Sequence, residues 1–487
     1  MKATFVGHAA VLVEANGISI LSDPWWQGPC FGAQWWIYPP PYLAPVNDRK
    51  IDYIYVSHGH HDHLHPGTLK SFDRSTKILV SRAAGLSQGL RELGFTVVEV
   101  PDDDRETDLG QGVKVRIRPT HGDDTLLCVT DGKEVLVNLN DALHSATPDV
   151  QKRFVDMLRR DYPSIDYLFC GYGVASHFPN CYIVPGQDQA KTAANRQAYF
   201  NRRWVDLVHG LQPRFAFPFA ADVVFLEHDL RWANEPTHNS ERPTDVFTAA
   251  YPAAQTIVHD IAPGFCIEDG VVVRPAWRAP VRNDEIASLM PEQILRANRY
   301  GSETAAQVLE VKRLLERNVE TCHRYLTEHR GHYRMLIRFR TATEGIEIAK
   351  SGSRIVVRIV PAEDADGTAY DLTFQTRLVY LKNALSTDYG HEILFVGSGG
   401  IFRYAGDDAV KNALHAELIA VLRANGVAPK SRFGDQSFAR YRLKQLVKKV
   451  LRVKQPTDLY DLQAWTMRQD ASPARAQPRR AVDSAAR

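Results

Sequence analysis

Short apolar runs separated by polar and turn-forming residues dominate the first part of the chain, a pattern typical of β-strands. One helical stretch, 83–93, interrupts them. The extended candidates are 3–6, 10–14, 18–22, 52–57, 77–80, 96–100, 113–118, 125–129 and 134–139. Helical periodicity follows over 147–160 and 188–210, with strand-like segments at 166–169 and 215–219. Strands mixed with helices in this way predict a layered α/β body.

The pattern changes after residue 275, and this change sets the expected domain boundaries. We expect a first domain over 1–275, a helical connector over 276–330 and a smaller α+β domain over 331–425. The smaller domain combines strand-like runs at 333–339, 355–359 and 370–377 with a helix at 408–425. A basic helical segment over 426–469 and a disordered tail over 470–487, rich in Ala, Arg, Pro and Ser, complete the prediction.

Composition places the chain among ordinary globular proteins and gives little sign of a polyanionic partner. The 487 residues carry a net charge of +2, with 44% hydrophobic and 24% charged residues, so binding to nucleic acid is not expected. No apolar run approaches the roughly 20 residues that cross a bilayer, and the run at 9–13 is too short for a signal peptide. Six scattered cysteines fit a reducing compartment, which predicts a cytoplasmic protein.

A helix expected at 439–454 carries an apolar face opposite lysines and arginines. Such a helix either packs on its own protein, which we favour, or makes peripheral contact with an anionic membrane.

The densest chemical signal is Ser57-His58-Gly59-His60-His61-Asp62-His63-Leu64-His65, in which five histidines fall within eight residues. Imidazole is the commonest metal ligand near neutral pH. His58 and His60 are two positions apart, so in extended backbone they point the same way and can share one ion. Asp62 and His63 follow where the chain turns toward a helix at Pro66, and they can face a second ion about 3.5–4 Å away.

Each ion needs further ligands, and the ends of later strands supply candidates. His121 follows the strand-like 113–118 and is the expected third ligand of the first ion. Asp141 ends the strand-like 134–139 and can bridge both ions, while His228 would complete the second. His177 and His144 are alternatives to His228.

The loop at 24–45 holds four tryptophans among prolines and glycines, at positions 25, 26, 35 and 36. Such a composition disfavours regular structure. The aromatics either form a wall over the metals, which would bind an apolar or ring-bearing part of a small-molecule substrate, or fix the loop to its own protein or to a second copy.

This ordered ligand set resembles the metallo-β-lactamase superfamily over roughly residues 1–275. The resemblance implies an αββα sandwich within an α/β (α+β) fold class, followed by the smaller C-terminal α+β domain. It places His58, His60 and His121 on one metal and Asp62, His63 and His228 on the other, with Asp141 between them. Gly7-His8-Ala9 and Asp23-Pro24 are similar to motifs near the site in the branch that includes ascorbate-phosphate lactonase and N-acyl-phosphatidylethanolamine phospholipase D.

A further resemblance is to the non-Rieske part of CMP-N-acetylneuraminate hydroxylase. It rests on Cys170-Gly171-Tyr172-Gly173, Pro218-Phe219-Ala220, Glu227-His228 and the run from Gly397 to Tyr404. A Rieske cluster needs two cysteines and two histidines, and no such set occurs in this sequence. The hydroxylase reaction is therefore not carried over.

The predicted activity is hydrolysis of an ester, lactone, amide or phosphodiester by a hydroxide that bridges two divalent metals. Zinc is the expected metal, and iron or manganese would accept the same ligands. We expect Asp62 and Asp141 to act in catalysis. His8, His144 and Tyr172 are candidates for the proton donor, with His8 selected, although a structural role is the more common one for each of them. A di-iron oxygenase and a metal-stabilised binding protein are the alternatives.

Overall fold

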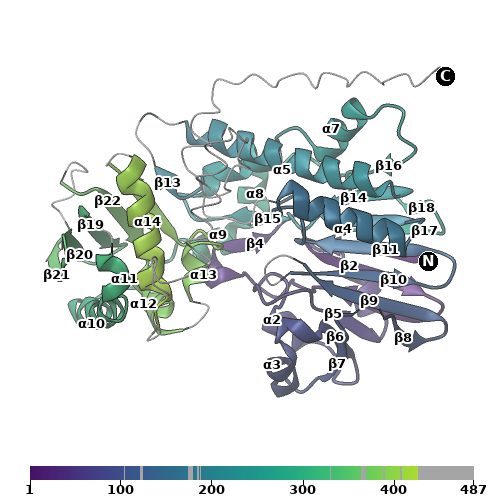
Figure 1. The fold of residues 1–487 in the computed structure, drawn as a ribbon, viewed down its shortest axis with the longest axis horizontal. Coiled ribbons are helices and arrows are strands. Elements are labelled where there is room, and N and C mark those ends of the chain that lie inside the picture. The colour runs from purple at the N-terminus through teal and green to yellow at the C-terminus, as the bar shows by residue number, and fades with distance from the viewer. Residues whose placement is uncertain are drawn as a thin grey trace, which may run out of the picture.

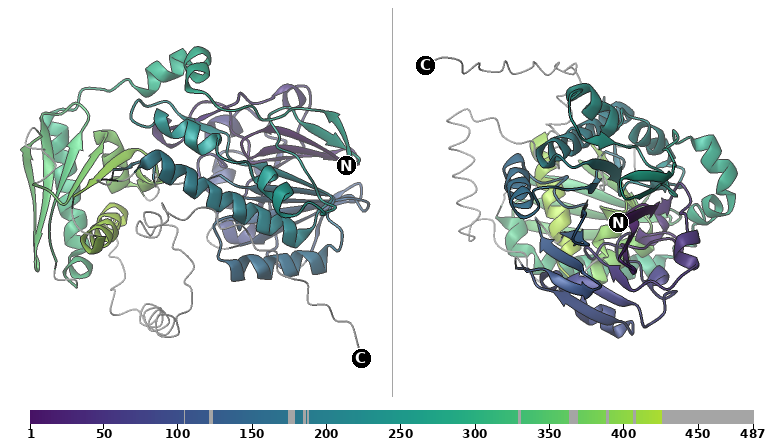
Figure 2. Two further views of the ribbon diagram at one scale, coloured as in Figure 1. Left: turned by 90° about the horizontal axis from the view of Figure 1, so that it is seen from above. Right: turned by 90° about the vertical axis from the view of Figure 1, so that its right-hand side faces the viewer.

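The structure is a computed structural model of the chain that describes residues 1–103, 105–120, 124–173, 179–183, 186, 188–328, 331–362, 369–387, 390–405 and 408–425. The predicted basic helical segment at 426–469 and the tail at 470–487 lie outside the described residues. Figure 1 and the left view of Figure 2 show two units side by side, a two-sheet sandwich and a smaller unit formed mainly by residues after 304.

Two facing sheets make up the sandwich. The first has the order β18 (Val271–Arg274), β17 (Cys266–Glu268), β1 (Lys2–Gly7), β2 (Ala10–Ala15), β3 (Ile18–Ser22), β5 (Tyr53–Tyr55), β6 (Lys77–Ser81) and β7 (Thr96–Val100). The second has the order β16 (Ile257–Val258), β14 (Phe215–Phe219), β12 (Tyr167–Gly171), β11 (Val135–Asn140), β10 (Thr125–Thr130), β9 (Val113–Pro119) and β8 (Thr107–Gly110). Strands β3, β5, β6 and β7 pair in parallel, as do β11, β12, β14 and β16.

Alternating side chains build three apolar layers around these sheets. On β5, Tyr55 points into the core between the sheets, while Ile54 packs on the outer side, toward α2 (Pro66–Leu69) and α3 (Ser87–Glu92). On β11, Leu136 faces the other sheet and Val137 faces α4 (Pro148–Asp161), α5 (Gln189–Leu211) and α7 (Pro243–Ala250). Helices thus cover both outer faces, and the predicted αββα sandwich is confirmed (Figure 1).

The helix expected over 83–93 is shorter than predicted. A 3₁₀ turn, η2 (Arg82–Ala84), precedes Gly85, whose φ of 67° is left-handed, and α3 begins only at Ser87. Glycine adopts this conformation without the steric cost that other residues pay, so it ends one element before the next begins.

The tryptophan loop contains more regular structure than its composition suggests. It holds η1 (Phe31–Ala33), β4 (Trp35–Ile37) and α1 (Ala44–Asn47), and β4 pairs with β15 (Val223–Phe225) in a separate two-stranded sheet. Trp25, Trp35 and Trp36 are buried. Burial of these rings fixes the loop to the protein, as one of the two predicted alternatives requires.

The smaller unit is a six-stranded sheet covered by helices. Its order is β13 (Tyr182–Ile183), β23 (Gly400–Tyr404), β22 (Leu372–Thr376), β19 (His332–Phe339), β20 (Glu344–Ser351) and β21 (Arg354–Pro361). The covering helices are α12 (Leu378–Ser386), α13 (His391–Leu394) and α14 (Asp408–Arg423). Because β13 comes from the first predicted domain, the two units share a strand and no boundary at residue 275 separates them cleanly.

The region predicted as a connector divides between the two units. Two short helices, α8 (Asn283–Leu289) and α9 (Pro291–Ala297), pack through Ile286 and Ala297 against buried residues of β4 and β15. In contrast, α10 (Ala305–Thr321) contributes Val308, Val311 and Leu315 to the core of the smaller unit and is followed by α11 (His323–Thr327). Helix α10 therefore belongs to the C-terminal unit.

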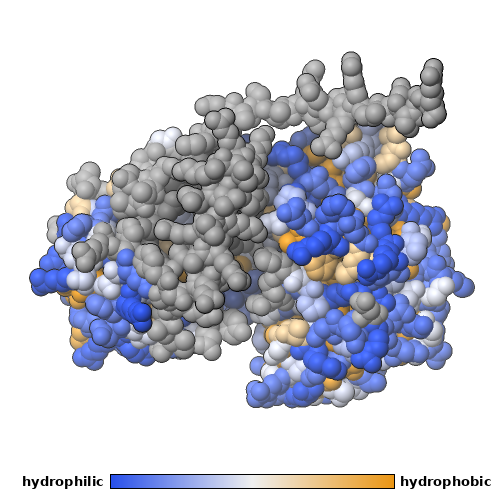
Figure 3. Space-filling model, in the orientation of Figure 1, coloured by the Kyte–Doolittle hydropathy of each residue, from blue (hydrophilic) through white to orange (hydrophobic). Residues whose placement is uncertain are grey.

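The face of the molecule in Figure 3 is mainly hydrophilic where it is coloured, with hydrophobic side chains scattered between charged ones. Within the described ranges, no helix combines the length and the apolar character needed to cross a bilayer.

Candidate metal centre

The histidine-rich loop leaves the first sheet at the end of β5, beside the ends of β3 and β11. Val56 still donates its N–H to Leu79 O at 3.1 Å, and the following residues depart from the sheet. The N–H groups of His63 and Leu64 both donate to His60 O, at 3.1 and 2.7 Å, so the chain turns sharply there. This turn gives Asp62 and His63 a different direction from His58, as the spacing predicts.

His58 and His60 converge through their ring nitrogens. The Nε2 atom of His58 lies 2.8 Å from the Nδ1 atom of His60. Two nitrogens that bind one zinc ion at about 2.0–2.1 Å are separated by a little over 3 Å in tetrahedral geometry, so this approach is close to that of a shared ion. His58 is buried, whereas His60 is partly exposed.

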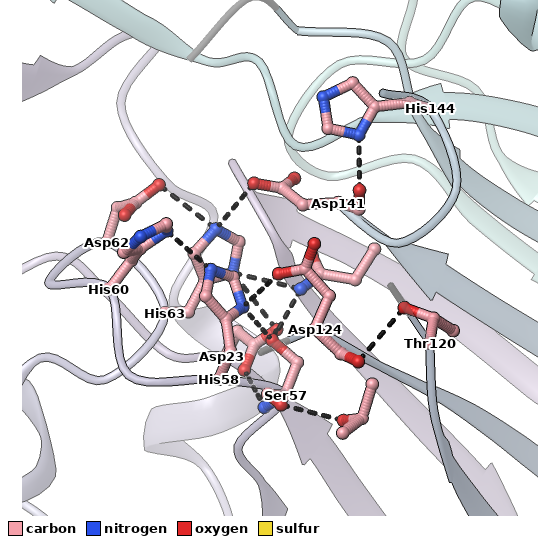
Figure 4. Close-up of polar contacts among 12 residues, drawn as sticks. Asp23, Ser57, His58, His60, Asp62, His63, Thr120, Asp124, Asp141 and His144 are labelled. Atoms are coloured by element: carbon pink, nitrogen blue, oxygen red, sulfur yellow. Dashed lines mark hydrogen bonds and ion pairs between the residues drawn. The ribbon is translucent and has the colours of Figure 1, made fainter. Parts of the chain in front are cut away.

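His63 lies between two carboxylates (Figure 4). Its Nε2 atom is 3.1 Å from Asp62 Oδ2 and 3.3 Å from Asp141 Oδ2, without hydrogen-bond geometry to either. The Nε2–H of His8 donates to Asp62 Oδ2 at 3.0 Å. The structure thus brings His8, His58, His60, Asp62, His63 and Asp141 together.

The electrostatics of this cluster follow from burial and mutual charge. Burial and the neighbouring histidines lower the pKa of His58 well below its usual value, which keeps its imidazole neutral. Burial opposes the charged forms of Asp62 and His63 as well. Their attraction outweighs it, lowering the pKa of Asp62 well below and raising that of His63 well above the usual values. Metal binding would displace the proton from His63, since a ligand nitrogen must carry its lone pair.

Outer polar partners orient the rings. Asp23, fully buried, accepts from His63 Nδ1 at 3.2 Å and from the N–H and hydroxyl of Ser57, both at 2.8 Å. The His58 Nδ1 atom lies 3.0 Å from Ser57 Oγ and 3.6 Å from Asp124 Oδ1. Burial and the nearby Asp141 raise the pKa of Asp124 to about 6.

Ser57 and Asp124 were not predicted as site residues. The Asp-Pro motif at 23–24 did indicate Asp23. Asn140, which donates to Ser57 Oγ at 2.5 Å, was also missed, although it immediately precedes Asp141.

The structure does not place every predicted residue in the cluster. His121 and His177 lie outside the described residues. His228 is exposed and its backbone N–H donates to Asn298, so the structure does not support it as a ligand. His144 turns its Nδ1 to the backbone oxygen of Asp141, as Figure 4 shows.

The remaining two histidines of the loop, His61 and His65, make packing and helix-capping contacts. His61 stacks on Phe31 with ring centroids 5.5 Å apart. His65 caps helix α2, accepting from the Thr68 N–H at 3.1 Å.

The cluster fits a bound cation because some of its buried polar atoms make no hydrogen bond in the described structure. These atoms are His8 Nδ1, Asp62 Oδ1 and His63 Nε2. An unsatisfied buried polar group costs about 1–3 kcal/mol, a cost that coordination would remove. Two sets of potential ligand atoms each lie within 4.8 Å of one another, the first from His8, Asp62 and His63 and the second from His58, His63 and Asp141.

A pocket adjoins the cluster on the side of His8, Asp62 and Asp141. Its apolar lining includes Trp35, Tyr172 and Phe225, and its polar lining includes the carboxamides of Asn180, Gln197 and Asn234. Tyr172 Oη accepts from Arg242 Nη2 at 2.6 Å. The loop thus contributes one tryptophan, Trp35, to a wall beside the candidate metals.

Comparisons with known proteins agree with this geometry. Residues 2–156 match the family described as "Beta-lactamase superfamily domain". A protein of Mycolicibacterium smegmatis described as a Rieske 2Fe-2S iron–sulfur protein is 27% identical over 248 residues, which cover 48% of this chain and 46% of that protein. The chain therefore spans about half the length of this relative.

Two further relatives match over shorter stretches. The cytidine monophosphate-N-acetylneuraminic acid hydroxylase of Danio rerio is 35% identical over 72 residues, or 15% of this chain and 12% of that enzyme. A metal-dependent hydrolase of Carboxydothermus hydrogenoformans is 48% identical over 64 residues, or 13% of this chain and 24% of that protein. Together with the two-sheet sandwich and the ligand loop at the end of β5, these matches support assigning the sandwich to the metallo-β-lactamase superfamily.

Proposed function

We propose that the protein is a dinuclear metal-dependent hydrolase whose substrate is a small molecule with an apolar or ring-bearing part. The observation that carries the proposal is the convergence, at the end of β5, of buried ligand atoms of Asp62 and His63 that make no hydrogen bond. A site kept for structural reasons alone would be expected to pair these atoms.

The chain's own residues divide into two ligand groups. His58 and His60 converge on one position, and we place His121 with them, as the family resemblance implies. Asp62 and His63 form the other group, and Asp141 lies against His63 between the two. His8, rather than His228, stands beside Asp62 and is suited to complete the second group or to hold a proton near it.

Two divalent ions held there would lower the pKa of a shared water and polarise the bond under attack. Asp62 and Asp141 would balance the charge of the ions, and Asp23 would keep the His63 ring in place through Nδ1. Trp35, Tyr172 and Phe225 line a pocket of about 40 Å³ beside the ligands, so they would contact only a small apolar part of the substrate and exclude water from the reacting bond.

Metal reconstitution tests the proposal directly. The chelated full-length chain would be loaded with zinc, manganese or iron and assayed on esters, lactones, amides and phosphodiesters. We expect about two ions per chain and hydrolysis of one substrate class that chelation abolishes and metal restores. Protein that folds but binds no transition metal under non-chelating conditions would contradict the proposal.

A di-iron oxygenase is the second candidate, because the chain matches a hydroxylase and a protein described as an iron–sulfur protein. The same ligand types accept iron. Metal analysis and optical spectra of anaerobically purified protein separate the two candidates. A redox-silent zinc pair supports the hydrolase, whereas an iron pair whose spectrum changes with oxygen supports the oxygenase.

A further inference from the structure

The C-terminal unit docks directly on the tryptophan loop. Tyr380 of α12 donates its hydroxyl to Gly32 O, and it accepts from Gln34 Nε2 at 3.0 Å. The turn after α13 approaches the same loop so closely that a Cβ atom on Gly397 would lie 2.5 Å from Phe31 Cβ. Glycine is required at this contact, since any side chain would collide with the buried ring.

The tryptophan loop in turn contacts the ligand loop. Cys30 donates its thiol to His61 O with a separation of 3.1 Å, and the Phe31 ring stacks on the His61 ring. The C-terminal unit is therefore connected to the candidate metal centre through two consecutive contacts.

One side chain of the C-terminal unit reaches a ligand itself. Glu392 of α13 places Oε1 at 3.8 Å from His60 Nε2, and its side chain is 13% exposed. The other nitrogen of the same ring, His60 Nδ1, faces His58 Nε2. The His60 ring thus has a ligand-facing nitrogen and an outer nitrogen that faces a carboxylate.

The other two histidines of the cluster also have outer polar partners, which lie at hydrogen-bond distance, whereas Glu392 lies at ion-pair distance from His60. The outer nitrogen of His63 faces Asp23, and the outer nitrogen of His58 faces Ser57 and Asp124. A neutral imidazole that binds a metal through one nitrogen carries its proton on the other, and an acceptor there fixes the tautomer and raises the basicity of the ligand. Of the three outer partners, only that of His60 comes from the C-terminal unit.

We propose that Glu392 is a positioning residue for the metal centre, through which the C-terminal unit fixes the tautomer and orientation of His60. The inference rests on the proposed metal centre and extends it, because it makes the second unit part of the site.

Metal affinity of the full-length chain tests this inference without an assay of activity. Zinc affinity would be measured by competition with a chromophoric chelator for the wild type, Glu392→Gln, His60→Ala and the double variant. We expect Glu392→Gln to weaken zinc affinity by about 10-fold, within the range for outer partners of metal ligands. The same substitution should have no further effect in the His60→Ala background, since the carboxylate would act through that ring.

The control is Glu310→Gln, which removes a carboxylate on α10 that pairs with Lys382 on the surface of the same unit. It should leave zinc affinity unchanged. Unchanged affinity of the folded Glu392→Gln variant would overturn the inference, and so would an equal loss in the presence and absence of His60. If the wild type binds no zinc, the proposed function fails first. If the wild type binds and hydrolyses while Glu392→Gln binds equally well, only this inference fails.

Discussion

The ligand loop, residues 57–65, and the junction where Glu227 of the sandwich meets Arg340 and Arg377 of the C-terminal unit are both clusters of charged groups. Their carboxylates have different partners. In the described ranges, the ion pairs of Asp62 and Asp141 are all with histidines. Glu227, whose side chain is 4% exposed, pairs instead with Arg377 and Arg340 from the C-terminal unit. Arginine stays charged at any physiological pH, whereas histidine can release its proton to make room for a metal.

This difference separates a site from a structural contact. At the junction, Glu227 receives hydrogen bonds on both oxygens, one from Gln34 Nε2 at 3.0 Å and another from Arg340 at 3.5 Å. In the ligand loop, Asp62 Oδ1 has no partner within the described structure. Burial alone therefore does not indicate function, but a buried carboxylate with an unused oxygen beside neutral imidazoles does.

Removing a metal ligand should have the largest effect, because it should abolish the function that distinguishes the ligand loop from the contact around Glu227. His60→Ala is expected to lower metal-dependent activity by more than about 1000-fold, because loss of even an outer partner typically costs about 10- to 100-fold. His61→Ala is the matched control, since His61 is an exposed histidine in the same loop that stacks on Phe31. Kinetics and metal content of both variants check this, and equal losses in the two would contradict the assignment.

Removing the carboxylate of Glu227 should instead lower stability without changing the metal site. Glu227→Ala leaves Arg377 and Arg340 without their shared acceptor, and breaking a buried ion pair in this way costs about 3–5 kcal/mol. Urea denaturation should report a loss near the lower end of this range, because Arg340 keeps its contact with Asp229. The metal content per folded chain should match that of the wild type.

The contrast also shows which parts of the molecule could be predicted from sequence. Strands with local alternation were predicted within a residue or two, as at β11, where 134–139 was expected and 135–140 is observed. The two-residue β13 and the β4–β15 pair depend on partners distant in sequence, β23 in the first case, and they leave no local pattern.

The same reasoning applies to the site. His58, His60, Asp62 and His63 could be placed because one loop holds them all. His228 could not, because its exposure is a result of tertiary packing, in which its neighbour Glu227 is buried against arginines of the other unit. Glu392 lies more than 300 residues from His60, and only the docking of α13 on the tryptophan loop brings them together.

A change in an outer partner should have an intermediate effect. Asp23→Asn replaces an oxygen that accepts from His63 Nδ1 and Ser57 Oγ with a donor amide, so one of these contacts is lost. We expect zinc affinity to fall by about 10- to 100-fold, with a smaller loss than in His60→Ala. Isothermal titration of the chelated protein measures this, and wild-type affinity in Asp23→Asn would show that the His63 orientation does not depend on Asp23.

A partly buried histidine of the C-terminal unit, His415, allows a test by pH. His415 of α14 lies 3.0 Å from Tyr182 Oη and 3.2 Å from Tyr404 Oη, and burial lowers its pKa from 6.5 to about 4. Because the unfolded chain binds this proton more readily than the folded chain, stability is fully present above pH 6.5 and is lost as the pH falls toward 4. A shift of this size removes about 2 kcal/mol of stability between pH 8 and pH 5.

His415→Asn should lose this part of the pH dependence in denaturation of the metal-free protein. The histidines of the ligand loop and His238, whose pKa burial lowers to about 3, are unchanged in that variant, so acid sensitivity that remains comes from groups other than His415. An unaltered pH profile in His415→Asn would show that His415 does not contribute to the acid sensitivity of the folded chain.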